Sequence, residues 1–204
     1  MDAPNTARTT LEALDPRIRR SRRMLQDALA TLLTTKDFDH ISIQDIAEAS
    51  ALNRATFYDH YPDKFTLLQC MVRSRFSELM AMRDIRVEDC AGGLRAVALG
   101  VCDYLAEVPA NGGKSHEGSI QTAIVGVIRT MLFEAFRERV FGDNVSPEVV
   151  SSTVAWAIYG AANAWVQNPE RCTAEQMADV IDRLIKPVLL AAAQDGDGRE
   201  LRAH

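Results

Sequence analysis

The sequence of 204 residues contains only four cysteines, and no two of them lie close together. Structural zinc sites take their ligands from closely spaced pairs, so this spacing excludes that class of site. We expect each thiol to lie reduced in a helix as a small apolar side chain. Oxidation sensing is the alternative, and it needs a basic and exposed setting. The four residues are Cys70, Cys90, Cys102 and Cys172.

The patterns of membrane segments and of enzymes are also missing. No apolar run is long or pure enough to span a bilayer, and the polar start MDAPNTARTT has no signal-peptide core. Neither a Glu-x-x-His pair, a nucleophile motif nor a glycine-rich phosphate loop occurs in a coherent setting. We therefore expect a cytoplasmic protein that is not an enzyme, holds no metal or cofactor, and does not bind a membrane.

Positive charge is scarce overall, since the formal net charge is −5. The distribution of charge matters more than its total for a nucleic-acid binder, and the run RIRRSRR at residues 17–23 concentrates it. This run begins a predicted helix with Asp15 as N-cap and Pro16 at the first helical position. Cations there oppose the helix dipole, so local stability does not explain them, whereas neutralisation of phosphates does. A solvated helix start is the alternative interpretation.

The stretch ISIQDIAEASALNRATFYDHYPDK, residues 41–64, has the pattern of two short helices joined by a tight turn. Ser42 and Asp45 come close to a capping box for the first helix, and Asn53 is an N-cap for the second. Pro62 then ends the second helix. These features predict a helix-turn-helix motif, whose second helix enters the major groove of DNA.

The first residues of such a recognition helix point at base edges. The forked donors of Arg54 match guanine O6 and N7, and the methyl group of Ala55 can touch a thymine methyl. Gln44, in the preceding helix, can reach an adenine or a phosphate. Side chains suited to contacts with the DNA backbone are Ser42, Thr56, Tyr58, His60 and Lys64. Each alone is as well explained by solvation or packing, and the agreement of caps, turn and donors favours DNA contact.

The segment from Arg17 to Leu68 resembles the N-terminal domain of the TetR family of bacterial transcriptional regulators. The resemblance lies in the basic first helix, the helix-turn-helix and the run YDHYPDK at residues 58–64. It implies phosphate contacts from Ser42, Thr56, Tyr58 and Lys64. It implies base contacts from Gln44, Arg54, Ala55 and His60. It further implies a homodimeric repressor that releases a palindromic operator in double-stranded DNA when a small molecule binds its C-terminal domain.

Two positions depart from the family pattern. Ala51 stands in the turn where the family usually has glycine, and alanine is less favourable than glycine if that residue adopts a positive φ. Asn53 stands where the family often has serine or threonine, and it is an equally good cap. Ala51 therefore bears on the contact geometry, and Asn53 does not.

The rest of the chain predicts long helices without strand alternation. The expected helices are 64–82, starting after Asp63 as cap, then 94–108, 119–141, 147–166 and a last one from a Thr173–Gln176 capping box. Pro187 should kink or end that last helix. We expect an all-α fold of about nine helices. Its expected segments are a disordered tail 1–15, a helix-turn-helix domain 16–64, a helical regulatory and dimerisation domain 65–194, and a disordered tail 195–204.

The last two helices predict an assembly. The helix at 147–166 is apolar on all sides and must be covered on two of them. Its own domain covers one side, and a second subunit best explains the other. Two helices from each of two chains would form a four-helix dimer interface, as the resemblance also implies. A larger monomeric core is the alternative.

The resemblance also implies an effector pocket among the C-terminal helices. Residues that could line it are Met131, Phe133, Phe136, Trp156 and Trp165, with Arg129 or Asn163 orienting a ligand. Aromatic residues at helical spacing more often belong to an ordinary core. The sequence identifies neither the effector nor the operator. A different class of protein also fits, namely a helical interaction protein whose helix-turn-helix binds another protein.

Overall fold

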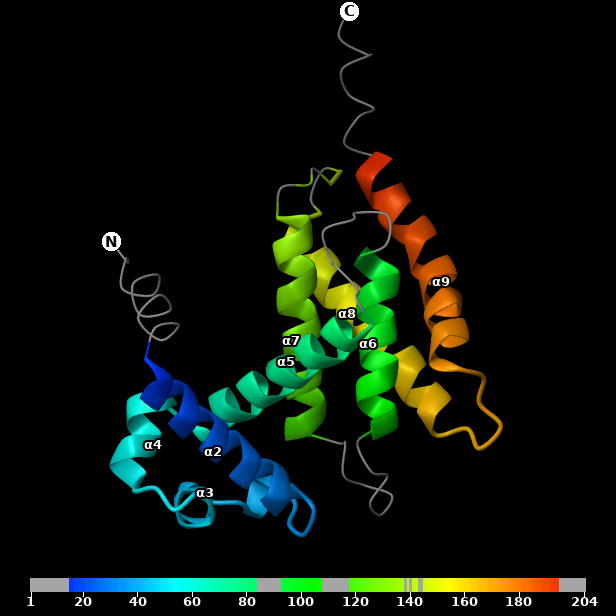
Figure 1. Ribbon diagram of the computed structural model, residues 1–204. Coiled ribbons are helices and arrows are strands. Elements are labelled where there is room, and N and C mark those ends of the chain that lie inside the picture. Colours follow the sequence, from blue (N-terminus) through cyan, green and yellow to red (C-terminus); the bar gives the residue numbers. More distant parts are fainter. Residues whose placement is uncertain are drawn as a thin grey trace, which may run out of the picture. The chain divides into compact units, whose positions relative to one another are not determined.

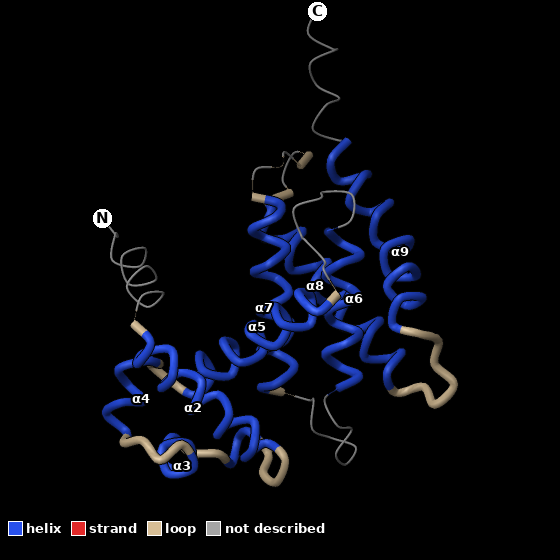
Figure 2. Tube along the Cα trace, in the orientation of Figure 1, coloured by secondary structure: helices blue, strands red, loops and turns tan. Residues whose placement is uncertain are grey.

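The computed structural model describes residues 15–83, 93–107, 118–137, 139, 141–142 and 145–194. Within this part of the chain every regular element is helical, with eight α-helices and one 3-10 helix (Figure 2). The predicted all-α fold is confirmed. The two predicted tails, apart from Asp15, lie outside the described residues. Cys90 also lies outside them, as do residues 108–117 before the helix predicted from 119.

The chain divides into two compact units after Met71. Unit 1 comprises the described residues up to Met71 together with residues 118–121 at the start of α7, and unit 2 comprises the remainder. The elements of unit 1 are α2 (Pro16–Leu33), η1 (Phe38–His40), α3 (Ile43–Ala49), α4 (Arg54–His60) and the first part of α5 (Lys64–Met82) (Figure 1).

Hydrogen bonds from capping side chains define where α2 and α5, the first and last helices of unit 1, begin. The Asp15 carboxylate accepts from the backbone N–H of Arg17 at 2.8 Å, and Pro16 occupies the first helical position. The Asp63 carboxylate accepts from the N–H of Thr66 at 2.7 Å, which starts α5. Both predicted caps are confirmed. The helices then bury one apolar set, comprising Leu25, Leu29, Phe38, Ile41, Ile46, Phe57, Tyr61, Leu67 and Leu68.

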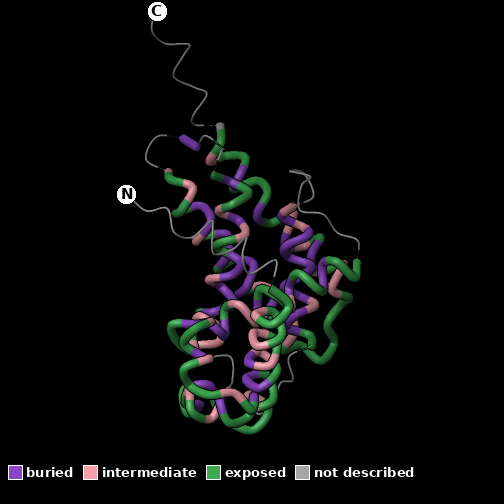
Figure 3. Tube along the Cα trace, turned by 60° about the vertical axis from the view of Figure 1, so that its left-hand side comes forward, coloured by how far each residue is buried: buried purple, intermediate pink, exposed green. Residues whose placement is uncertain are grey.

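Unit 2 is a bundle of long helices around α6. It contains the rest of α5, α6 (Gly93–Glu107), most of α7 (Ser119–Phe136), α8 (Pro147–Val166) and α9 (Ala174–Gln194). Helix α6 packs against both α8 and α9, which also contact each other. Figure 3 shows the buried residues gathered where helices face one another. Most side chains of α6 are buried, which is consistent with its position at the centre of the bundle.

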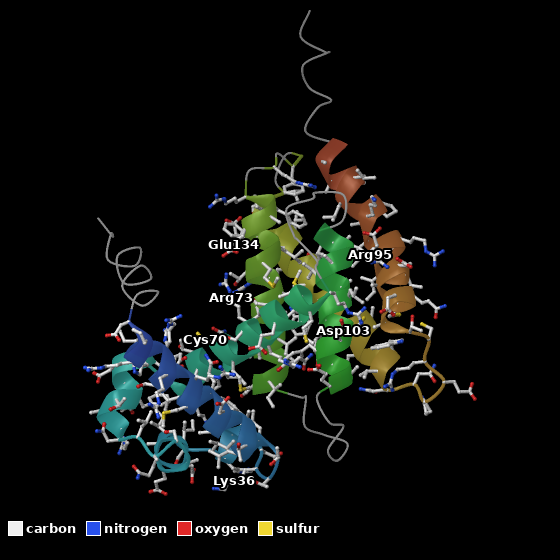
Figure 4. The ribbon with its side chains drawn as sticks, viewed as in Figure 1. Lys36, Cys70, Arg73, Arg95, Asp103 and Glu134 are labelled. Atoms are coloured by element: carbon white, nitrogen blue, oxygen red, sulfur yellow. The ribbon has the colours of Figure 1, made fainter. Side chains whose placement is uncertain are left out.

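Helices α5 and α6 approach closely at Gly100. A Cβ atom there would meet the Phe76 ring at 3.4 Å, and the Phe76 and Tyr104 rings stack with centroids 5.1 Å apart. Ion pairs reinforce the packing of unit 2 at its surface (Figure 4). The Nη2 atom of Arg73 lies 3.5 Å from Oε1 of Glu134, and Nε of Arg95 on α6 lies 2.6 Å from Oδ1 of Asp179 on α9. These pairs are partly exposed and contribute less than the apolar packing.

Most of the predicted helix bounds agree with the structure, and the end of one helix does not. The helices at 64–82 and 147–166 are confirmed, as is the Thr173–Gln176 capping box. Helix α7 ends at Phe136 instead of 141, because the following chain turns so that the N–H of Gly142 donates to the carbonyl of Ala192 in α9 at 2.8 Å. Helix α9 continues through Pro187 to Gln194, so this proline does not end the helix.

Helix α7 corrects the expectation about apolar runs. By length and composition alone, Ser119–Phe136 is able to cross a membrane. Core helices pass the same test, and α7 buries side chains such as Ile124, Ile128 and Leu132 in unit 2. The run is therefore a core helix of this bundle.

The three described cysteines are free, with Cys102 buried, Cys70 partly buried and Cys172 exposed. Burial, and to a lesser degree the neighbouring Asp103 carboxylate, raises the pKa of Cys102 to about 12, so its thiol stays protonated at neutral pH. Cys172 lies in the connection between α8 and α9, which corrects the expectation that each cysteine lies in a helix.

Candidate nucleic-acid interface

Helix α3 begins at a complete capping box. The Asp45 carboxylate accepts from the N–H of Ser42 at 2.8 Å, and the Ser42 hydroxyl accepts from the N–H of Asp45 at 3.1 Å. Lys36 adds an ion pair of 3.1 Å to the same carboxylate. The Ser42 hydroxyl and amide, followed by the Lys36 ammonium, lower the pKa of Asp45 to about 2. The predicted box is therefore confirmed and carries a full negative charge at neutral pH.

The turn after α3 is closed by a left-handed residue. Ala51 has φ of 54°, and it is the only non-glycine residue with positive φ in the described part of the chain. Its N–H donates to the carbonyl of Glu48 at 3.1 Å, and the N–H of Leu52 donates to that of Ala47 at 3.0 Å. The expected strain at this turn is therefore present, because alanine occupies a conformation that suits glycine.

Helix α4 has one face buried and another exposed. The Asn53 side chain accepts from the N–H of Thr56 at 2.7 Å, which confirms it as N-cap. Phe57 is fully buried and fixes the inner face. Residues on the outer face are Arg54, Ala55, Tyr58 and Asp59. The guanidinium of Arg54 forms no hydrogen bond or ion pair with any described residue, so its five donors face solvent.

The basic helix α2 packs against both α3 and α4. At the contact with α4, the Arg22 guanidinium lies 5.2 Å from the Tyr61 ring centre, and the Gln26 amide donates to the Tyr61 hydroxyl at 3.1 Å. Other arginines of the basic run, Arg19, Arg20 and Arg23, are exposed and have no hydrogen-bonding or ionic partner among the described residues. Among the described residues, Arg19, Arg20 and Arg23 therefore give α2 unpaired positive charge. Figure 1 shows this helix beside α4.

The other predicted DNA contacts differ in how free their side chains are. Gln44 is exposed, and its amide donates to the Glu48 carboxylate at 2.6 Å. The Thr56 hydroxyl donates to the cap Asn53 at 3.0 Å, and His60 is partly buried. Lys64 is also partly buried, and its ammonium donates to three backbone carbonyls near η1. Unit 1 brings all eight predicted residues into α3, α4 and the start of α5, and their DNA contacts remain predictions.

An open groove lies beside the start of α3 and the start of α5. Its lining residues are Asp39, His40, Ile41, Ser42, Ile43, Asp63, Lys64 and Phe65. The sequence did not predict that Asp39 lines this groove and binds a residue of α7. The Asp39 carboxylate accepts from the Ser119 hydroxyl, 80 residues along the chain, at 2.8 Å. A contact at such a separation leaves no local signal.

The seven residues predicted for an effector pocket lie in unit 2 on α7 and α8. Phe136 and Trp165 are buried and Met131 is partly buried. The four residues kept as candidates for ligand binding are Arg129, Phe133, Trp156 and Asn163. Arg129 and Trp156 are exposed, whereas Phe133 and Asn163 are partly buried. Among the described residues, no hydrogen bond, ion pair or ring contact joins any two of these four. The amide oxygen of Asn163 is buried and has no hydrogen-bond partner within that part of the chain.

The sequence of unit 1 matches a known family of proteins. Residues 25–71 match the bacterial regulatory proteins of the TetR family. The uncharacterized HTH-type transcriptional regulator YxbF of Bacillus subtilis strain 168 is 43% identical over 68 residues, which are 33% of this chain. The match spans only 18% of that relative's own length. The family match therefore covers the segment that contains α3 and α4.

Solved structures with a similar fold cover most of the chain. The crystal structure of Lin0861 from Listeria innocua has a TM-score of 0.62 and 17% identity, covering 86% of this chain and 94% of that one. A protein described as a TetR-family transcription regulator from Shewanella sp. PV-4 has a TM-score of 0.51 and 14% identity, covering 82% and 97%. At these identities the likeness supports the fold alone.

Proposed function

We propose that this chain, whose residues 25–71 match the TetR family of bacterial regulatory proteins, is a homodimeric, cytoplasmic repressor of transcription that binds a palindromic operator. Residues 16–64 form its DNA-binding domain, and residues 65–194 form its regulatory and dimerisation domain. A small molecule bound in the second domain releases the operator. The protein acts by binding and has no catalytic role.

The observation that carries this proposal is the exposed face of α4. Phe57 anchors the helix on one side, while Arg54 on the other has no partner in the described residues. A guanidinium at the first turn of a recognition helix is suited to bidentate contact with guanine. Arg19, Arg20 and Arg23 on α2, which have no ionic or hydrogen-bonding partner among the described residues, add the phosphate-directed charge that such contact needs, since most DNA affinity comes from the backbone.

Apolar residues on the exposed faces of α8 and α9 support the homodimer. Trp156 is 50% exposed, Leu184 65% and Val188 60%. Gly160, one turn beyond Trp156, has no atom within 4 Å of the place where a Cβ would stand, so α8 presents open backbone there. Exposed apolar patches of this kind mark protein interfaces. Two copies pairing through α8 and α9 would cover these side chains and place two reading heads about 34–36 Å apart on DNA.

The buried and unpaired amide oxygen of Asn163 supports an effector site in unit 2. A buried acceptor without a partner destabilises the unliganded state, and a ligand that donates a hydrogen bond would satisfy it. Phe133, Arg129 and Trp156 belong to the same proposal. Release of DNA requires that the effector bind more tightly to the state that does not bind the operator.

The proposal is tested by selecting duplexes from a random library with the purified full-length chain. We expect enrichment of a two-fold symmetric sequence, bound by two copies of the chain in sedimentation experiments. Footprinting of the DNA next to the gene then locates the natural site. A chain that enriches no sequence, under conditions where it is folded, would contradict the proposal and favour a helix-turn-helix that binds another protein.

A further inference from the structure

Backbone carbonyls of the turn before α3 surround the ammonium group of Lys64. Its Nζ lies 3.0 Å from the carbonyl oxygen of Phe38, 3.2 Å from that of Asp39 and 2.8 Å from that of Ile41. An ammonium group has three protons, so these bonds use all of its donors. The same atom lies 4.7 Å from the centre of the Phe38 ring. The charge of Lys64 is thus satisfied inside unit 1.

The turn that Lys64 holds leads directly into the helix-turn-helix. Phe38 and Ile41 are both buried, and the N–H of Ile41 donates to the carbonyl of Phe38 at 3.1 Å. The next residue is Ser42, the N-cap of α3. Carbonyls at the end of a short helical turn carry partial negative charge and attract a cation. Lys64 therefore fixes the direction from which the chain enters α3.

We propose that Lys64 is a positioning residue of the DNA-reading head and that it makes no phosphate contact. It fixes the turn before α3, and α3 packs against α4, so Lys64 sets the direction in which Arg54 points. The inference rests on the proposed DNA-binding function. It departs from the phosphate contact that the TetR resemblance implies at this position.

Two substitutions separate positioning from phosphate contact. Lys64→Arg keeps the charge and would preserve a phosphate contact, because a guanidinium binds phosphate well. The planar fork of arginine cannot direct three donors at three converging carbonyls, so a positioning residue is not replaced by it. Lys64→Met keeps the length and apolar stem and removes all three donors. As a matched control, Arg20→Gln removes an exposed cation of α2 that has no partner among the residues that the structure describes.

The affinity of each variant is measured over a salt series, on the duplex that the wild-type chain selects and on a random duplex. Loss of one phosphate contact lowers the slope of log K against log salt by about 0.9, and we expect that change for Arg20→Gln. For Lys64→Met and Lys64→Arg we expect an unchanged slope. Affinity for the selected duplex should fall on the order of tenfold, as for loss of a charge-assisted hydrogen bond. Affinity for the random duplex should stay the same.

The temperature is chosen so that circular dichroism shows every variant fully folded, which separates a loss of orientation from a loss of stability. A purely structural role would leave the ratio of selected to random affinity unchanged in the folded protein. Two results would overturn the inference while leaving the DNA-binding function intact. One is a slope of log K against log salt that is smaller for Lys64→Met than for the wild type. The other is wild-type affinity of Lys64→Arg for the selected duplex.

Ammonium NMR of the wild-type chain gives a test that does not depend on a variant folding. The signal of Lys64, one of four lysines, should exchange slowly because of its three bonds, and it should not shift when the selected duplex is added. A shift on DNA binding would overturn the inference. Failure to select any duplex would refute the proposed function, and with it the inference, even if the slowly exchanging signal is present.

Discussion

Replacing Ala51 by glycine tests the geometry of the turn between α3 and α4. A left-handed conformation costs an alanine about 1–2 kcal/mol relative to the right-handed one, and glycine adopts it freely. Glycine also makes the unfolded chain more flexible, which offsets about 0.4–1 kcal/mol of that gain. Ala51 is exposed, so no buried contact is lost. We expect Ala51→Gly to raise the free energy of unfolding by about 0.5–1 kcal/mol.

The assay is urea unfolding followed by far-UV circular dichroism, at one protein concentration, because assembly also stabilises the folded state. Ala30→Gly is the matched control. Ala30 is likewise exposed, but it lies inside α2, where glycine lowers the free energy of unfolding by about 1 kcal/mol. The same substitution should therefore have opposite signs at the two positions. Equal destabilisation by both variants would refute the left-handed turn and the reasoning built on it.

Three further predictions concern the cap, the core and the assembly. The stability advantage of the wild type over Asp45→Asn should be constant above the ordinary pKa of 3.8 and should shrink as the pH falls to about 2, because folding lowers the pKa of Asp45 to that value. The midpoints of urea unfolding, compared between the two proteins across pH, measure this advantage. A difference in midpoint that does not depend on pH would contradict the prediction. Phe57→Ala should lower the free energy of unfolding by about 3–5 kcal/mol, whereas Tyr58→Ala should lower it by about 0.5–1.5 kcal/mol, because the exposed Tyr58 ring loses only its edge contact with the Phe57 ring. Similar losses in the two variants would be inconsistent with the described faces of α4. The double variant Leu184→Asp/Val188→Asp should convert a dimer into a folded monomer in sedimentation experiments, and a dimer that persists would exclude this face of α9 as the interface.

The features that could be predicted from the sequence are those set by neighbours along the chain. An N-cap bonds to a backbone N–H two or three residues later, so Asp15, Ser42 and Asn53 were identifiable from local spacing alone. The eight residues that the sequence predicts to contact DNA, including Lys64, were found together for this reason, since they lie within 23 positions of one another. The resemblance to the TetR family, which usually has glycine in this turn, indicated that Ala51 would be less favourable than glycine at a positive φ, and its φ is 54°.

The features that the sequence did not predict depend on distant residues. The acceptors of Lys64 lie 23 to 26 residues away, and the Ser119 partner of Asp39 lies 80 residues away. The residues after Phe136 carry no helix-stopping glycine or proline until Gly142, so nothing local ends α7 there. In α9 the packing of Ile185 and Leu189 on the rest of unit 2 outweighs the hydrogen bond that Pro187 cannot make.

The most direct test of DNA reading by α4 compares the binding of Arg54→Ala and the wild type to the selected duplex. Arg171→Ala is the control, since Arg171 is also exposed but lies in the connection between α8 and α9 of unit 2, outside every proposed binding site. We expect Arg54→Ala to lose about 1–3 kcal/mol of binding free energy and to discriminate less well against base changes at one position of each half-site. Arg171→Ala should bind as the wild type does. Wild-type affinity and discrimination in Arg54→Ala, with the fold unchanged, would contradict a reading role for α4.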